Sequence, residues 1–276
     1  EEMAAINNAS NSNFELAGEM VFNTTPGNPF SETYNNGSYE GVIYLTKPPK
    51  VSPYIVNGKP SVIYLGAISC FYCAENRWAM ALALSRFGSF SKLFAGYSSY
   101  GDDDVPTIYW NQDNYTAVGA TFGNFYTSNY INFISADYDS PITGGFEFPQ
   151  SGVSYFIGAA PNSTYKAAYQ QVNSSKLFGG TPFSIWGAAA QDGADAVILG
   201  TAQAGQSTSM PPISYMTHRQ ILAQVASFNT TFAKEEYAAA DVYIAELCPS
   251  INNTAQICSL PAIQKMEGVM GLNATK

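Results

Sequence analysis

The sequence predicts an α/β fold with a small central mixed sheet flanked by helices. From about residue 58 onward, short apolar runs rich in β-branched and aromatic residues alternate with longer segments of good helix formers. Of the 276 residues, 46% are hydrophobic, which is enough to fill one large core. Because strands and helices alternate, with insertions between them, we expect one sheet covered by helices.

Residues 1–57 are predicted to form a polar extension, called here the N-terminal arm, with one short strand at 39–45. Residues 1–38 contain 15 Asn, Ser or Thr and little periodic apolar pattern. Residues 47–60, KPPKVSPYIVNGKP, have the proline content of an extended linker. We therefore predict an arm at 1–57 and a domain at 58–276.

The domain 58–276 is predicted to contain five strands and five helices, including extra helices at the C-terminus. The first strand, 61–67, is mainly β-branched and aromatic, which is typical of a strand buried on both faces. The helix that follows, 71–87, consists mostly of good helix formers and ends at Gly88. The other strands are expected near 93–98, 130–137, 182–186 and 195–201, and the other helices near 163–175, 218–228, 233–248 and 254–267.

A C-x-x-C pair, Cys70 and Cys73, lies where the first predicted strand gives way to the helix. Cys70 is expected at the helix N-terminus, where unsatisfied backbone N–H groups and the helix dipole stabilise a thiolate. Cys73, one turn later, is expected to be the resolving thiol. This placement predicts disulfide exchange, in which Cys70 attacks a partner disulfide and Cys73 then releases the partner.

A zinc site is the other common use of this spacing, and the rest of the chain does not complete one. Cys248 and Cys258 are separated by nine residues, and His218, at the start of a predicted helix, is the only histidine. No G-x-S-x-G, P-loop or G-x-G-x-x-G motif is present. We expect neither a metal ion nor a cofactor.

Several short motifs surround the cysteine pair: G-K-P, L-G-A, C-x-x-C-A, R-W and L-S-R-F-G, all between residues 58 and 88. With these motifs the chain resembles an archaeal family of uncharacterised secreted or membrane-anchored thioredoxin-like proteins. Segments 128–138 and 179–186 and the C-terminal cysteine pair fit the same family. The resemblance implies a thioredoxin-like central sheet, in which Pro182 of the Thr181-Pro182 pair matches the cis-proline that presents backbone to a bound substrate.

The site differs from many redox-active relatives in two places. Phe71 and Tyr72 stand between the cysteines, where such relatives often carry proline, and Ser69 replaces a tryptophan. Two interpretations stay open: an active exchange site, or a permanent structural disulfide between Cys70 and Cys73. Of the three possible pairings of four cysteines, short separations favour this one together with Cys248–Cys258.

Nine N-x-S/T sequons predict an exported, N-glycosylated chain. An even number of cysteines agrees with an oxidising exterior. The chain begins at Glu1 and has no apolar run of the roughly 18 residues that a membrane span needs, so we expect a mature extracellular or cell-surface product from which a signal or anchor has been removed. The sequons are at Asn8, Asn23, Asn36, Asn114, Asn162, Asn173, Asn229, Asn252 and Asn273.

The charge pattern excludes nucleic acid as a partner. Only 12% of residues are charged, the net charge is -9, and there is no basic patch to neutralise phosphates. The polarity comes instead from Asn, Ser, Thr, Gly and Tyr, a balance common in secreted proteins.

Two function classes remain. The first is a thiol-disulfide oxidoreductase or isomerase that acts on protein thiols or disulfides through Cys70, Cys73 and Pro182. The second is a glycosylated cell-surface structural or filament-forming protein on the same scaffold, in which Cys70–Cys73 is a structural disulfide. Its strand at 39–45 would self-assemble by pairing with a sheet edge of a neighbouring subunit.

Overall fold

Strand β4 (Lys59–Gly66) is the centre of the sheet in the computed structural model of this chain. It pairs in parallel with β9 (Asn132–Asp137) and antiparallel with β10 (Phe183–Trp186), which pairs in turn with β11 (Ala189–Gln191). A short β3 (Ile55–Val56) forms a hairpin with the start of β4. The structure describes residues 2–23, 34–35, 38–39, 45, 47–67, 70–98, 104–110, 125–137, 170, 182–191, 213 and 216–272.

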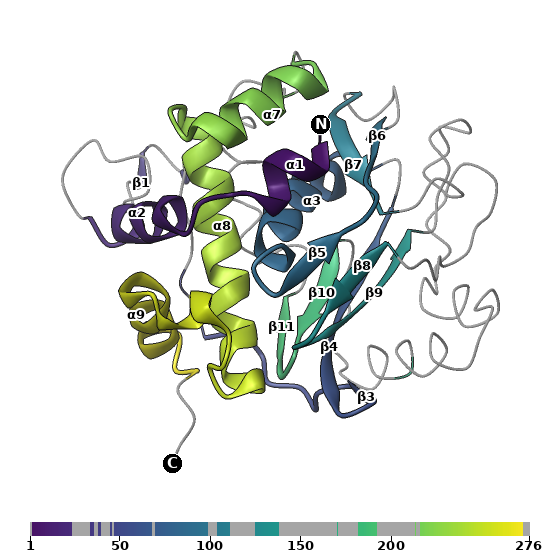
Figure 1. The fold of residues 1–276 in the computed structure, drawn as a ribbon. Coiled ribbons are helices and arrows are strands. Elements are labelled where there is room, and N and C mark those ends of the chain that lie inside the picture. The colour runs from purple at the N-terminus through teal and green to yellow at the C-terminus, as the bar shows by residue number, and fades with distance from the viewer. Residues whose placement is uncertain are drawn as a thin grey trace.

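The helices that cover the sheet are α3 (Phe71–Leu84) and α8 (Thr231–Leu247), which pack against each other (Figure 1). Aromatic side chains join α8 to the sheet: the Trp186 and Tyr243 rings stack with centroids 4.5 Å apart. Both rings are fully buried, and so are Val62 and Tyr64 of β4. The mixed α/β class is therefore confirmed, with β4 buried on both faces as the sequence predicts.

Two short antiparallel strand pairs extend the structure beyond the central sheet. β5 (Gly88–Phe90) pairs with β8 (Tyr126–Ser128), and β6 (Phe94–Tyr97) pairs with β7 (Pro106–Tyr109). The second pair is tight because Gly96 has no side chain; a Cβ there would lie 1.8 Å from the Tyr109 ring. β7 lies along α3, where the Trp78 indole N–H donates to the Pro106 carbonyl at 3.1 Å.

The N-terminal segment contains two helices that the sequence analysis missed, α1 (Glu2–Asn7) and α2 (Asn11–Val21). They lie on the outer side of α3 and α8 rather than extending away as an arm (Figure 1). Phe14 and Ala17 of α2 are fully buried, and Gly18 approaches so closely that an added Cβ would lie 2.6 Å from that of Ala262. The prediction of an extended arm is wrong for residues 2–23, because Phe14, Ala17 and Gly18 share one face of α2 and that face packs against α8 and α9.

Arg86, just after α3, fastens α1 to the rest of the fold. Its guanidinium donates to the carbonyls of Ala9 at 2.5 Å and Asn7 at 3.0 Å, so a cation lies at the C-terminal end of α1. The Asn7 side chain also bonds Phe90 of β5 in both directions, donating to its carbonyl and accepting from its N–H. These contacts make α1 part of the core.

Most of the predicted strand at 39–45 lies outside the described residues. Its first residue ends β2 (Ser38–Tyr39), which pairs with β1 (Tyr34–Asn35). The predicted strand at 195–201 and nearly all of the predicted helix at 163–175 also lie outside the described residues.

The C-terminal part is helical, as predicted. It contains α7 (His218–Ser227), α8, the 3-10 helices η4 (Cys248–Ile251) and η5 (Gln256–Ser259), and α9 (Pro261–Val269). The helix predicted at 254–267 begins later, at Pro261, because proline favours the first turn of a helix and the preceding residues form a 3-10 turn. Within the described part of the chain, no helix is long and apolar enough to cross a membrane.

Candidate functional site

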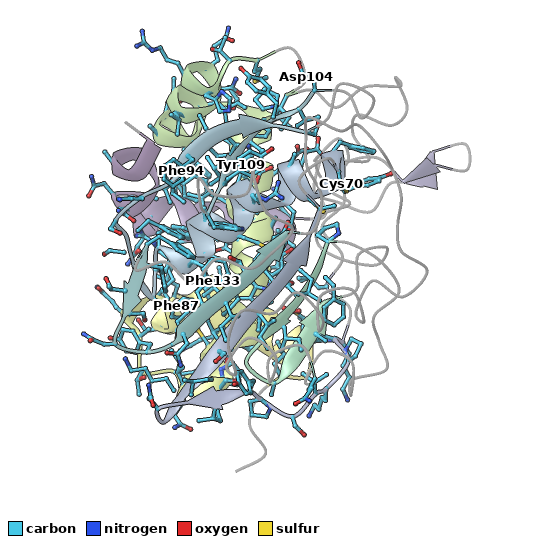
Figure 2. The ribbon with its side chains drawn as sticks, turned by 90° about the vertical axis from the view of Figure 1, so that its right-hand side faces the viewer. Cys70, Phe87, Phe94, Asp104, Tyr109 and Phe133 are labelled. Carbon is cyan, nitrogen blue, oxygen red and sulfur yellow. A yellow bond between two sulfur atoms is a disulfide. The ribbon has the colours of Figure 1, made fainter. Side chains whose placement is uncertain are left out.

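Cys70 is the N-cap residue of α3 (Figure 2). Cys73 lies in the first turn of the same helix. The backbone of Cys70 is extended, so the chain turns from the end of β4 into the helix at this residue. The Cys70 sulfur accepts the Cys73 backbone N–H at 3.4 Å, which is the hydrogen bond that an N-cap side chain normally makes. The strand-to-helix placement predicted from the sequence is therefore observed.

The predicted Cys70–Cys73 disulfide is not formed in this structure, in which the two sulfurs are not bonded. Cys70 is 4% exposed and Cys73 is fully buried. N–H groups at the start of α3 and the positive end of its dipole favour a thiolate on Cys70.

Pro182 lies at the same end of the sheet as the two cysteines. It is buried and immediately precedes β10, in which Phe183 pairs with Leu65 of β4. The antiparallel register therefore brings Pro182 beside the end of β4, from which the chain leads to Cys70. The structure thus places Pro182 at the end of the sheet where β4 ends.

Phe71 and Tyr72, between the cysteines, are half-buried and lie against each other with ring centroids 3.8 Å apart. The pair adds apolar and aromatic surface directly beside Cys70. Such surface suits contact with a partner polypeptide, because an aromatic ring brings large contact area at low entropic cost.

Arg77, one helical turn after Cys73, is fully buried and was not predicted from the sequence as a site residue. One guanidinium nitrogen donates to the Ala67 carbonyl at 3.1 Å, and the guanidinium carbon lies 5.1 Å from the Tyr109 ring centroid and 5.8 Å from that of Tyr64. The backbone N–H of Ala67 in turn donates to the Cys73 sulfur at 3.3 Å. A sequence signal was available, since Arg77 stands in the middle of a helix whose other residues are almost all apolar.

The interface between α3 and α8 is rich in buried polar groups. The Asn76 amide donates to the Tyr243 hydroxyl at 2.5 Å, and Glu75, Glu236 and Glu246 are each 1% exposed. Burial raises the pKa of Tyr243, and the nearby carboxyl groups of Glu246 and Glu236 raise it further, so the phenol stays neutral.

His218 is the first residue of α7 and serves to attach that helix to a hairpin. Its Nε2 lies 2.7 Å from the Gly96 carbonyl and 2.9 Å from the Thr107 carbonyl, so this nitrogen carries the proton and donates to both strands. Because both acceptors are backbone carbonyls, the His218 ring has a structural role. This agrees with its predicted position at the start of a helix. Among the described residues, no group of three or more His, Cys, Asp or Glu side chains could hold a metal ion.

The second cysteine pair forms the predicted disulfide. Cys248 and Cys258 are bonded, with their Cα atoms 5.7 Å apart, and both sulfurs are buried where η4 and η5 meet α8. The bond closes a short loop and belongs to the core rather than to the thiol site.

Four of the nine predicted glycosylation positions are described, and all four are exposed: Asn8, Asn23, Asn229 and Asn252. Each lies next to the end of a helix, where backbone and side chain face solvent. The other five, Asn36, Asn114, Asn162, Asn173 and Asn273, lie outside the described residues.

Comparison with known protein families gives a match. A family described as Domain of unknown function (DUF929) matches residues 47–185, which is half of the chain and includes Cys70, Cys73 and Pro182. No curated protein and no solved structure matches the chain.

Proposed function

The chain belongs to the DUF929 family, and since that family has no known function, we propose from the site itself that the protein exchanges thiols and disulfides through Cys70 and Cys73. The observation that carries this proposal is the Cys70 sulfur at the N-cap of α3, one turn from a second thiol. A helix N-terminus is the setting in which cysteines become reactive as thiolates.

The arrangement of the sheet supports a thioredoxin-like fold for this proposal. The strand order is β9-β4-β10-β11, with β4 and β9 parallel and β10 and β11 antiparallel. The two thiols follow β4, a proline precedes β10, and a late helix, α8, packs against α3. The thiols after β4 and the proline before β10 support the thioredoxin-like fold that the resemblance implies.

The proposed reaction has two exchange steps. The Cys70 thiolate attacks a partner disulfide, whose S–S bond breaks; one partner sulfur leaves and takes up a proton, and the other stays bonded to Cys70. Cys73 loses its proton and attacks the Cys70 sulfur, which releases the second partner sulfur. The partner gains two electrons and two protons, and the Cys70–Cys73 dithiol becomes a disulfide. The reverse sequence oxidises a partner dithiol, and stopping after the first step permits isomerisation.

The test is reduction of insulin disulfides by dithiothreitol, with and without the protein. We expect the wild-type protein to accelerate the reaction and Cys70→Ser to abolish the acceleration. The matched control is the Cys248→Ser/Cys258→Ser double variant, which removes the other two sulfurs and leaves the site intact. Equal rates for wild type and Cys70→Ser would refute the proposal.

We further propose that the protein is exported, glycosylated and displayed outside the cell. The four exposed sequon asparagines and the Cys248–Cys258 disulfide support this location, because stable disulfides are favoured in oxidising compartments. Mass spectrometry of protein from its native source, before and after removal of N-glycans, should show glycan on Asn8, Asn23, Asn229 and Asn252. Unmodified asparagine at all four positions would contradict the proposal.

The alternative is a glycosylated cell-surface structural or filament-forming protein. The exposed sequons favour this structural function as much as they favour an exported enzyme. Residues 2–23 fold onto the protein's own core, so the segment that would pair with a neighbouring subunit is the predicted strand at 39–45. Light scattering of the full chain and of a variant lacking 39–45 separates the two functions. Ordered polymers that the deletion abolishes favour assembly, and a monomer in both cases excludes it.

A further inference from the structure

Arg77 is placed to act on the resolving thiol. Cys73 and Arg77 are four residues apart on α3, so their side chains lie on the same face of the helix, one turn from each other. Both reach the same residue at the end of β4: Ala67 donates its N–H to the Cys73 sulfur at 3.3 Å and accepts from the Arg77 guanidinium at 3.1 Å. All three residues are buried.

The position of the guanidinium is determined on several sides. Its carbon lies 5.1 Å from the centre of the Tyr109 ring and 5.8 Å from that of the Tyr64 ring, distances at which an aromatic ring attracts a cation. β7, which carries Tyr109, is held against the first turn of α3, where the Thr107 hydroxyl donates to the Ala74 carbonyl at 2.6 Å. The guanidinium is therefore held one helical turn after Cys73, on the carbonyl of Ala67, and away from water.

We propose that Arg77 is a positioning residue for the resolving step: it holds Ala67 so that the Ala67 N–H points at the Cys73 sulfur, and its buried charge stabilises the Cys73 thiolate. This inference rests on the proposed exchange at the same site and assigns the part of the machinery that activates the second thiol.

The physical basis is that the resolving cysteine attacks only as a thiolate, and burial alone opposes its ionisation. A hydrogen bond from an N–H to a charged sulfur is stronger than one to a neutral thiol, so fixing the donor favours the charged form. A cation one helical turn away adds to the same preference, and its effect is large where water is excluded.

Other ionisable groups on the elements packed around the site also influence Cys73. Buried carboxyl groups disfavour a thiolate when they are ionised, and the two tyrosines are aromatic partners of the arginine. These groups are Glu75 on α3, Tyr64 on β4, Tyr109 on β7, and Glu236, Tyr243 and Glu246 on α8. Because none of them is altered in the variants below, a difference between variants reports on Arg77.

The test follows the ionisation of Cys73 alone. In a Cys70→Ser variant labelled with [3-¹³C]cysteine, Cys73 is the one thiol that titrates, since Cys248 and Cys258 are joined in a disulfide. The Cβ chemical shift is followed from pH 5 to pH 11, in the Cys70→Ser background with Arg77 unchanged and with Arg77→Met or Arg77→Lys. Arg219→Met, the same substitution at an exposed position on α7, is the matched control.

We expect Arg77→Met to raise the titration midpoint of Cys73 by about one pH unit or more, the size of shift that a nearby opposite charge produces. Arg77→Lys keeps the charge but loses the planar fork that reaches Ala67, so it should raise the midpoint by less. The control should leave it unchanged. A purely structural arginine would lower the melting temperature without moving the midpoint, and that result in Arg77→Met overturns the proposal.

If Arg77→Met does not fold, Arg77→Lys decides: an unchanged midpoint overturns the positioning role, and a raised one supports it. Cys70→Ser cannot carry out the exchange cycle, so this titration is independent of insulin reduction. A raised titration midpoint of Cys73, together with no insulin reduction by the wild-type protein, would refute the exchange function and still support the coupling between Arg77 and Cys73.

Discussion

Replacement of Glu235 by Gln should stabilise this protein at neutral pH and leave its stability nearly unchanged in acid. Glu235 lies in the first half of α8 and is 5% exposed. Burial raises the pKa of its carboxyl group from the usual value of 4.5 to about 7. The folded protein therefore holds a proton on Glu235 over a pH range in which the unfolded chain has released it.

The sign and size of the effect follow from this difference. Below pH 4.5 the carboxyl is neutral in both states and has no pH-dependent effect on stability. Between pH 4.5 and pH 7 the unfolded state ionises first, so the free energy of unfolding falls as pH rises, and above pH 7 the full cost applies. A shift of this size corresponds to about 3 kcal/mol.

Gln has nearly the same shape as protonated Glu and does not ionise, so it removes this cost. Urea unfolding of wild type and Glu235→Gln should give equal free energies at pH 4 and a gain of about 3 kcal/mol for the variant at pH 8. Glu19→Gln, at an exposed position on α2, is the matched control for the exchange of a carboxyl for an amide. The reasoning is refuted if Glu235→Gln gives the same difference at both pH values, or if it destabilises the protein at pH 8.

Three further predictions follow from buried contacts. Asp241→Asn should also raise the free energy of unfolding, by an amount that grows as pH rises above about 4, because burial, with a smaller contribution from Glu15, raises the pKa of the Asp241 carboxyl well above its usual value. Urea unfolding at a series of pH values measures this difference, and a difference that is constant with pH contradicts the prediction. Arg86→Met should lower the free energy of unfolding by about 2–4 kcal/mol, since α1 loses its hydrogen bonds to the guanidinium. The amides of residues 2–9 should then exchange with solvent ahead of global unfolding, and uniform exchange across the chain would count against this account. The Cys248→Ser/Cys258→Ser variant should lose about 2–3 kcal/mol in free energy of unfolding and still reduce insulin. A folded variant without that activity would show that the disulfide supports the site.

The central elements were predictable because their patterns are strong. β4 is a short apolar run that ends at a glycine, and α3 is a long run of helix formers that starts after a cysteine, so sequence alone located the junction that holds Cys70. α3 ends at Leu84, before the predicted end at residue 87. Pro182 was found from the family resemblance rather than from periodicity. The strand register explains why it lies by the thiols, and register is a long-range property that no local pattern contains.

The elements that were missed depend on tertiary contacts. α1 and α2 are held by Arg86, Asn7 and the close approach of Gly18 to Ala262, long-range contacts that leave no local signal. Arg77 was missed although its position in a mainly apolar helix was a signal, because charged residues on helices usually face solvent, whereas this one is buried beside two tyrosine rings.

The most direct test of the exchange function is to trap its intermediate. Cys73→Ser and Cys70→Ser are each incubated with a peptide that contains one disulfide, and the products are separated without reductant and identified by mass spectrometry. Cys73→Ser should accumulate a mixed disulfide between Cys70 and the peptide, because the attacking thiol is present and the resolving thiol is absent. Cys70→Ser should form little or none. No mixed disulfide in Cys73→Ser, or equal amounts in both variants, would contradict the roles assigned to the two cysteines.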